Sequence, residues 1–440
     1  MQDWLWASAT DLGRRIGTGA IDPVALTEAY LDAIANSPLA PRIYVHVTAE
    51  RARREAAAAA DRARAGSRLS ALDGVPISWK DLYHTAGVES TSGSAMLAGR
   101  IPKRDAKVVQ NAGKAGLVCL GKTHQTELAF SGLGLNPVTQ SPPCVNDAEA
   151  VSGGSSSGAA ASVAFGLAAA AIGSDTGGSV RIPSVWNDLV GLKTVSGRLS
   201  LEGVVPLCAR FDTVGPLCRS LEDAALLLAA LEGSKPADLA DFSLEGARLG
   251  ILKTTAFGSI EDAPRAAFEN AAQRLQNAGA IVEPFETETV SEAAALGPIL
   301  FPAEAYGTWR DLIEEKGDMM YGPVRARFLQ GKTIMAADFI AGWHRLEALR
   351  QDYHDAVCDF DAVILPSSPI RPPKMQALLD DDAYFTAQNL LALQNTRIGN
   401  LLGLTALTLP TGVPSCGIMV QGRREEDILA IGKAMEAALS

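Results

Sequence analysis

The sequence has few cysteines and histidines, and neither set forms a metal-binding pattern. Six cysteines are spread over 440 residues without a Cys-x-x-Cys motif, so we predict reduced thiols rather than a disulfide framework. The five histidines form no His-x-x-x-His pair and no His-Glu-x-x-His motif. No Gly-x-Gly-x-x-Gly motif is present, which argues against a dinucleotide-binding module. We therefore expect no metal and no cofactor.

The sequence also lacks the long hydrophobic runs of membrane proteins. Its longest weakly apolar run, residues 159–172, is rich in alanine and too short to span a bilayer, so we predict a buried helix there. The N-terminus has neither the basic nor the apolar segment of a signal peptide. The formal net charge of −11 is unfavourable for binding a polyanion. We expect a cytoplasmic protein that binds no membrane and no nucleic acid.

Strand-like and helix-like segments alternate along the chain, which favours an α/β fold. Asp22-Pro23 and Ser220 carry the cap signals of two helices. Further strands are predicted near 72–80, 118–121, 248–252, 280–282 and 361–366, and further helices over 48–65, 106–115 and 262–278. No segment resembles a linker, so we expect one large domain, 1–440, with a central mixed β-sheet flanked by helices on both faces. Residues 285–360 are helix-rich and poor in motifs, and we expect them to shape a substrate pocket.

The most informative residues lie in two Gly/Ser-rich stretches and at one predicted strand end. Ser155 and Ser179 each follow a Gly-Gly pair and lie 24 positions apart, and Lys80 lies 75 positions before Ser155. Glycine pairs allow unusual backbone dihedrals and a close approach of a ligand to the main chain. A serine directly after such a pair lies beside exposed N–H groups. This arrangement suits a nucleophile next to an oxyanion site.

The order and spacing of these three residues resemble the amidase signature family, which hydrolyses amides through a Ser-Ser-Lys triad. The resemblance covers most of the chain and is densest over residues 74–216, the expected signature core of the domain. It implies that Ser179 is the nucleophile that forms an acyl-enzyme. It also implies that Ser155 is a bridging serine after a cis peptide bond, and that Lys80 is the base.

The same resemblance implies an oxyanion hole formed by the N–H groups of Thr176, Gly177, Gly178 and Ser179. Lys80 can act as a base only in its neutral form, so its pKa must lie below the usual value of about 10.4. Burial would cause such a shift, and the apolar sequence neighbours of Lys80 are consistent with burial.

Four more residues are candidates for substrate binding. Phe130, Ser131 and Gly132 match a loop that lines the substrate site in the family, and Ser131 is the best polar candidate among them. Arg181 has two interpretations. It could bind a substrate carboxylate, or it could be a structural arginine that holds the loop of residues 175–179, which we favour.

A rival motif overlaps the first Gly/Ser stretch. The sequence from Gly154 to Gly158 also matches Gly-x-Ser-x-Gly, the nucleophile elbow of α/β-hydrolases. This hypothesis would make Ser156 the nucleophile and requires an acid and then a histidine downstream. Only His344 and His354 follow, both in charge-rich, helix-like surroundings, so the elbow is disfavoured.

Several functions share this predicted chemistry. The leading hypothesis is a stand-alone amidase that releases ammonia or an amine from a small carboxamide, with a small-molecule amide as its ligand. The alternatives are the glutaminase subunit of a tRNA-dependent amidotransferase and a hydrolase of ureido compounds of the allophanate or biuret type. A catalytically inactive scaffold is disfavoured by the intact triad. A homodimer or a small helper protein is compatible with the sequence.

Overall fold

The computed structural model describes residues 2–239, 242–253 and 255–440. In this part of the chain, an 11-stranded mixed sheet forms the centre, and β4 (Pro143–Cys144) and β5 (Asp147–Val151) form a small separate sheet. In spatial order, the large sheet consists of β1 (Tyr44–Val47), β3 (Val118–Thr123), β2 (Pro76–Lys80), β6 (Ala170–Ser174), β8 (Val214–Cys218), β7 (Val190–Lys193), β12 (Thr405–Pro410), β13 (Gly417–Gly422), β11 (Ala362–Pro366), β9 (Arg248–Leu252) and β10 (Ile281–Phe285).

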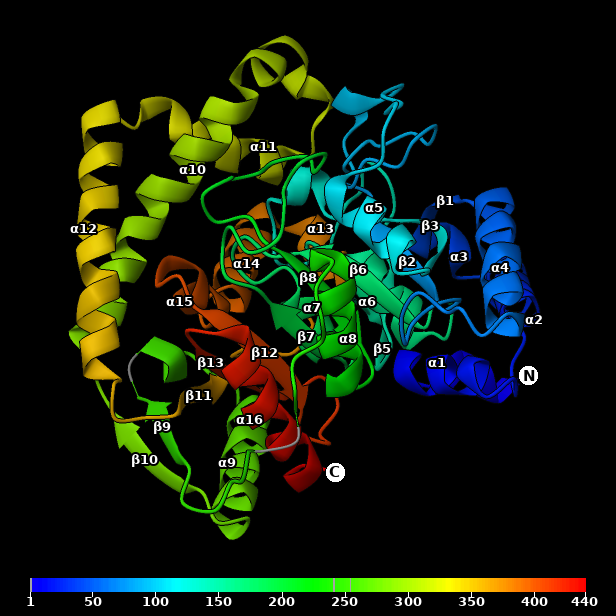
Figure 1. Cartoon of the computed structure of the whole chain (residues 1–440). Helices are drawn as coiled ribbons and strands as arrows, with labels where there is room; N and C mark the ends of the chain where they lie inside the picture. The colour runs from blue at the N-terminus through cyan, green and yellow to red at the C-terminus, as the bar shows by residue number, and fades with distance from the viewer. Residues whose placement is uncertain (1, 240–241, 254) are drawn as a thin grey trace.

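Helices surround this sheet (Figure 1). The α-helices of the described residues are α1 (Ala9–Gly17), α2 (Pro23–Asn36), α3 (Ala40–Ile43), α4 (Ala49–Arg64), α5 (Lys107–Lys114), α6 (Ser157–Ala164), α7 (Arg181–Trp186), α8 (Leu221–Glu232), α9 (Asp262–Asn277), α10 (Glu288–Lys316), α11 (Gly322–Leu329), α12 (Ala336–Ala356), α13 (Met375–Asp380), α14 (Asp382–Ala392), α15 (Thr396–Leu401) and α16 (Glu425–Ala438). Helices α1, α5 and α16 pack against α8, and α9 packs against α16, while α3, α6 and α7 form a second group.

The centre of the sheet is buried on both faces. Every residue of β2, β6, β8 and β11 is buried, although successive side chains of a strand point to opposite faces. At one edge, in contrast, no residue of β10 is buried. Strands that are covered on both sides are typical of α/β folds. The fold is therefore the predicted single-domain mixed sheet flanked by helices.

The predicted helix starts are confirmed by their caps. The Asp22 side chain accepts hydrogen bonds from Val24 N and Ala25 N at the start of α2. Ser220 does the same for Asp223 N at the start of α8. These bonds satisfy N–H groups that the first helical turn leaves without a partner. The predicted strands and the other predicted helices are also present, with small differences at their ends.

The predicted helix over residues 159–172 is wrong in its second half. Helix α6 ends at Ala164, and Gly166 follows with a φ of 70°, a left-handed conformation that suits glycine. Residues 170–174 then form β6, which pairs with β2 on one side and β8 on the other. Alanine has high helix propensity, but here pairing in the sheet overrides that local preference.

The helix-rich character predicted for residues 285–360 is confirmed. The long helices α10 and α12 pack side by side at one edge of the molecule, and α11 lies between them in the chain (Figure 1). In residues 2–239, 242–253 and 255–440, no helix combines the length and the apolar character needed to cross a membrane.

Candidate active site

Lys80 lies where two parallel strands end side by side. Strand β2 ends at Lys80 and strand β6 ends at Ser174, and the two strands are neighbours in parallel register. The Lys80 side chain is fully buried. Its Nζ donates hydrogen bonds to Ser155 Oγ at 2.7 Å and to Ser174 Oγ at 2.8 Å. The predicted neighbourhood of Lys80 and Ser155 is therefore present.

The surroundings of Lys80 favour its neutral amine. Burial lowers the pKa of Lys80 to about 7, and the carboxylates of Asp175 and Asp212 oppose that shift without cancelling it. Its two hydrogen-bond partners are neutral hydroxyl groups, so no directly bonded carboxylate holds the ammonium form. A lysine with this pKa can accept a proton near neutral pH.

Ser155 lies in the loop that leads into α6. The Gly154–Ser155 peptide bond is cis, as the family resemblance implies. The backbone at Gly154 passes so close to Gly134 that an added Cβ would lie 2.4 Å from Gly134 N. Only glycine therefore fits at position 154. Ser155 itself is fully buried.

Ser179 lies in a loop that Asp175 holds in place. Asp175 follows β6 directly, and its carboxylate accepts hydrogen bonds from Gly178 N (2.8 Å), Val180 N (3.1 Å) and Arg181 Nε (3.0 Å). Burial would raise the pKa of Asp175, but the Arg181 guanidinium holds that pKa well below its usual range. At Gly178 the loop has a φ of 142°, and a Cβ there would lie 2.1 Å from Thr396 Oγ1. Gly178 of the second glycine pair thus allows close packing.

The two serine segments lie next to each other. Ser156 N donates a hydrogen bond to Ser179 O at 3.3 Å. The hydrogen bonds of the described residues include the one between Lys80 and Ser155 but none between the Ser155 and Ser179 hydroxyl groups. Ser155 is expected to bridge its two partners, and the structure shows only the bond to Lys80.

Ser156 has a structural role that the nucleophile-elbow hypothesis does not provide. Its hydroxyl donates to Ser174 O at 3.2 Å and accepts from Ser174 N at 3.3 Å, so it joins its loop to the end of β6. His344 and His354 lie on α12, and no hydrogen bond of the described residues joins either to Ser156. The elbow hypothesis has no support in this geometry.

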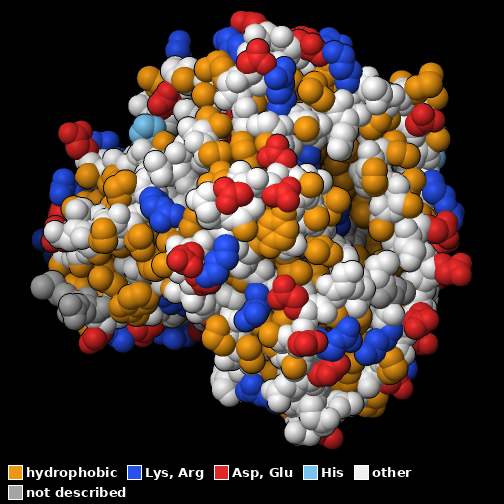
Figure 2. Space-filling view, turned by 180° about the vertical axis from the view of Figure 1, so that it is seen from behind, with side chains coloured by type: hydrophobic (Ala, Val, Ile, Leu, Met, Phe, Trp, Pro, Cys, Tyr) orange, Lys and Arg blue, Asp and Glu red, His pale blue; other side chains and the backbone are white. Residues whose placement is uncertain are grey.

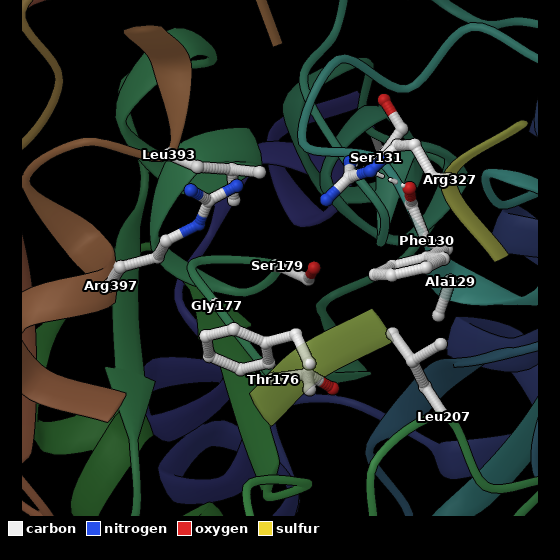
Figure 3. A pocket seen from close by; sticks show the side chains of 11 residues that line it. Ala129, Phe130, Ser131, Thr176, Gly177, Ser179, Leu207, Arg327, Leu393 and Arg397 are labelled. Carbon is white, nitrogen blue, oxygen red and sulfur yellow. Dashed lines mark hydrogen bonds between the residues drawn. The ribbon is translucent and has the colours of Figure 1, made fainter. Parts of the chain in front are cut away.

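Ser179 opens onto a cavity with two kinds of wall (Figure 3). One wall comes from residues 74–216, and we call it the motif side. It consists of Ala129, Phe130, Ser131, Thr176, Gly177, Ser179 and Leu207. The residues from the later part of the chain form what we call the helical side, namely Phe301, Arg327, Leu393 and Arg397. Phe301 and Arg327 belong to the helix-rich stretch 285–360.

The candidate substrate-binding loop lies partly on this cavity. Phe130 and Ser131 line it, and the Ser131 hydroxyl donates to Asn389 Oδ1 at 3.0 Å. Gly132 is not among the lining residues. Its N–H donates to Asn389 Oδ1 at 2.8 Å, and a Cβ added at this position would lie 2.9 Å from Leu393 Cγ. A role of Gly132 in substrate binding stays a prediction.

Arg181 is structural, which is the interpretation that the sequence favours. Its guanidinium is fully buried and donates to Asp175, Asn400 Oδ1 (2.6 Å) and Thr396 O (2.7 Å). It is not among the residues that line the cavity. With its donors in use, Arg181 does not bind a substrate carboxylate in this arrangement, and its inclusion among the binding residues is wrong.

The predicted oxyanion hole keeps three of its four N–H groups. Gly178 N donates to Asp175 Oδ1 and does not face the cavity, so Gly178 is not a free donor, contrary to the prediction. Among the hydrogen bonds of the described residues, none uses the N–H of Thr176, Gly177 or Ser179, and all three line the cavity. They are the groups available to an oxyanion.

A second glycine-containing stretch matches a nucleotide-binding pattern without forming such a site. Residues 116–123 read Gly-x-x-x-x-Gly-Lys-Thr, the pattern of a phosphate-binding loop. Residues 118–123 of this stretch form strand β3 rather than a loop before a helix. The Lys122 amine is buried and donates to Asp81 Oδ1 at 2.9 Å and Ser90 Oγ at 2.7 Å. A lysine with these partners does not reach out to a phosphate.

Three charged residues are among those of the site that were not predicted from the sequence. Two are arginines of the helical side, Arg327 on α11 and Arg397 on α15. The third is Asp175, the anchor of the Ser179 loop. For Asp175 a signal was available, because an aspartate two residues before a glycine pair is typical of a turn. No local pattern marks either arginine.

Comparisons with known proteins identify the family of the chain. The family model described as Amidase matches residues 25–429. The chain is 33% identical over 414 residues to a 2-amino-5-chloromuconic acid deaminase of Comamonas testosteroni, and the match covers 91% of this chain and 89% of the relative. It is 30% identical over 468 residues to a glutamyl-tRNA(Gln) amidotransferase subunit of Roseiflexus sp. (strain RS-1), over 97% of this chain and 95% of the relative.

A solved structure described as an amidase has a TM-score of 0.89 with this chain at 28% identity, and the match covers 99% of this chain and 100% of that one. Family model, relatives and structure thus agree over nearly the whole length. The chain therefore belongs to the amidase signature family, whose enzymes hydrolyse amide C–N bonds.

Proposed function

We propose that the chain hydrolyses a small carboxamide through an acyl-enzyme formed on Ser179, with Ser155 and Lys80 transferring the proton. The observation that carries this proposal is the buried Lys80 amine, whose pKa is lowered to about 7 and which lies 2.7 Å from Ser155 Oγ. A buried lysine with hydroxyl partners and no directly bonded carboxylate is suited to accept a proton.

In the proposed first half-reaction, Ser179 Oγ attacks the amide carbon. Its proton passes to Ser155, and the Ser155 proton passes to Lys80 Nζ. The N–H groups of Thr176, Gly177 and Ser179 stabilise the oxyanion. When the C–N bond breaks, the proton returns through Ser155 to the leaving nitrogen, which departs as ammonia or an amine.

In the second half-reaction, a water molecule gives its proton along the same path and attacks the Ser179 ester. The carboxylic acid leaves, and Ser179 regains its proton. Both half-reactions require the Ser179 hydroxyl to turn towards Ser155. Rotation about one bond of a serine is fast, and catalytic hydrogen bonds are often completed only when substrate is bound.

A second candidate is the glutaminase reaction of an amidotransferase, which the similarity to amidotransferase subunits favours. The deaminase relative, by its name, acts instead on an amino-substituted muconic acid, which is consistent with an enzyme of small acids. On the face shown in Figure 2, acidic and basic side chains are interspersed and form no single basic area. We favour the stand-alone amidase. A cytoplasmic location, a homodimer and the binding of a small helper protein stay predictions.

The test is ammonia release by the purified chain alone from three sets of compounds, namely small carboxamides, ureido compounds and glutamine. We expect turnover of carboxamides that is lost in Ser179→Ala. If the chain hydrolyses none of these compounds by itself, and hydrolyses only glutamine once a partner protein is added, the amidotransferase alternative is established. Turnover restricted to allophanate or biuret would establish the ureido alternative.

A further inference from the structure

Two arginines of the helical side point into the cavity from opposite sides and lie near Ser179 (Figure 3). Arg327 Nη1 donates to Phe130 O at 2.9 Å, and its guanidinium lies 4.3 Å from the centroid of the Phe130 ring. Arg397 lies beside the Ser179 loop. A Cβ added to Gly177 of this loop would lie 3.6 Å from Arg397 Cγ. Among the described residues, no ion pair and no side-chain hydrogen bond involves Arg397.

The contrast with Arg181 shows that these two arginines are unusual. Arg181 also contacts the Ser179 loop, but its guanidinium pairs with Asp175 and donates to Asn400 Oδ1 and Thr396 O. Arg327 and Arg397 have no acidic partner in residues 2–239, 242–253 and 255–440. Both arginines are half-buried. A cation that loses contact with water without gaining an acidic partner costs free energy, and two such cations that face each other also repel.

The electrostatic effect is visible in both groups. Burial and the neighbouring Arg397 lower the pKa of Arg327 to about 9, and burial lowers the pKa of Arg397 to about 10. Both guanidinium groups are still protonated at neutral pH. None of the described residues that line the cavity is an aspartate or a glutamate. The cavity therefore has a net positive charge that an anion would neutralise.

We propose that the amide substrate carries a carboxylate, which Arg397 binds while Arg327 provides a second positive charge across the cavity. The guanidinium fork of arginine matches a carboxylate with two parallel hydrogen bonds. Leu207, Phe301 and Leu393 supply an apolar wall for a short carbon chain between the two functional groups. The substrate class is thus a half-amide of a short dicarboxylic acid. This inference rests on the proposed function and narrows it.

The experiment compares half-amides with diamides of the same length, namely malonamate, succinamate and glutaramate with malonamide, succinamide and glutaramide. Each pair differs only in a carboxylate that replaces a neutral carboxamide of the same shape. We expect kcat/KM for at least one half-amide to exceed that for its diamide by about 10- to 100-fold, as for hydrogen bonds to a charged group. Faster turnover of the diamide at every length would overturn the inference.

Variants locate the effect. Arg397→Gln should reduce this preference to within about threefold, and Arg397→Lys, which keeps the charge but not the fork, should retain part of it. The matched control is Arg325→Gln, because Arg325 lies on α11 near Arg327 but bonds Asp318 at the surface, at 2.6 Å. It should keep the full preference. A preference that persists in both Arg397→Gln and Arg327→Gln would overturn the assignment.

A binding measurement separates this inference from the proposed function. Calorimetric titration with succinate should show binding to the wild-type chain, no binding to Arg397→Gln, and no binding of neutral succinamide. In parallel, a fluorophosphonate probe tests whether Ser179 is nucleophilic. Labelled Ser179 without binding of malonate, succinate or glutarate overturns the inference alone. Unlabelled Ser179 with succinate binding that depends on Arg397 overturns the proposed function alone.

Discussion

The two sides of the cavity differ in how their polar groups are held. On the motif side, Ser131 bonds Asn389, Thr176 Oγ1 bonds Asp212 at 2.5 Å, and Asp175 holds the Ser179 loop. These groups lie at the ends of buried strands or in loops tied to them. On the helical side, Arg397 has no partner among the described residues, and Arg327 bonds only a carbonyl oxygen.

This difference suggests a division of work. A side chain that is fixed by several hydrogen bonds can hold the reacting atoms in one geometry for any substrate. A side chain that lacks a partner gains one only when a suitable ligand binds. We therefore expect changes on the motif side to affect all amides alike. Changes on the helical side should alter the ratio between substrates.

The largest effect is expected for Ser179→Ala, which removes the attacking oxygen. All measurable hydrolysis should be lost for half-amides and diamides alike, and a reactive serine probe should no longer label the protein. Ser156→Ala is the matched control, because Ser156 lies in the neighbouring loop and its hydroxyl bonds only the backbone of Ser174. Label found on Ser156 in the wild-type protein would instead establish the nucleophile elbow.

The next largest effect is expected for Lys80→Met. Loss of one general base typically costs about 10²- to 10⁴-fold, and we expect a larger loss of kcat/KM because Lys80 and Ser155 act as a unit. Lys80→Arg should not restore activity, since a guanidinium stays protonated at any workable pH. Full activity of Lys80→Arg would mean that only a positive charge is needed. The proton transfer proposed above would then be wrong.

Lys122→Met should lower the stability of the fold much more than Lys80→Met does. Lys122 forms a fully buried ion pair with Asp81, and loss of one partner of such a pair costs about 3–5 kcal/mol. Lys80 has only hydroxyl partners, so Lys80→Met should unfold at a denaturant concentration close to that of the wild type. Equal destabilisation by the two substitutions would show that Lys80 is also structural.

The neighbourhood of Lys80, Ser155 and Ser179 was largely predictable from sequence because its signals are local and resemble a known family. Lys80 follows an apolar strand, and Ser155 and Ser179 each follow a glycine pair. Two details were not predictable. Gly178 turns its N–H to Asp175 because the loop closes on that carboxylate. The alanine-rich stretch after Ala164 becomes a strand because β2 and β8 offer it backbone partners.

The helical side was not predictable at all. Arg327 and Arg397 lie on different helices, far apart in the chain, and only tertiary packing brings both to one cavity. Nothing in their local sequence distinguishes them from surface arginines such as Arg325. An unpartnered charge is a property of a cavity rather than of a segment. It can be recognised only after the chain has folded.

A more moderate effect is expected for pH. Because the pKa of Lys80 is lowered to about 7, the neutral amine is the minor form at lower pH and the major form at higher pH. In the free enzyme kcat/KM should fall about tenfold per pH unit below about pH 7 and level off above it. Since Lys80 serves every substrate, half-amides and diamides should share the same acid limb. If the acid limb of the kcat/KM profile lies at different pH for half-amides and diamides, the proposed division of work between the motif side and the helical side is wrong.

The smallest effect is expected for Leu393→Val on the helical side. Leu393 is buried, lines the cavity and packs against Gly132, so loss of one methylene leaves a little more room beside the bound carbon chain. One methylene in an apolar pocket changes discrimination by about 1–3 kcal/mol at most. The residues around position 393 can partly fill the vacated space, which makes the effect smaller. We expect the ratio of kcat/KM values to shift roughly three- to tenfold towards the longer of two half-amides. Leu391→Val, two residues away and off this cavity, should not shift the ratio. If Leu393→Val slows all half-amides equally, whatever their length, Leu393 supports the reacting geometry itself and belongs functionally to the motif side.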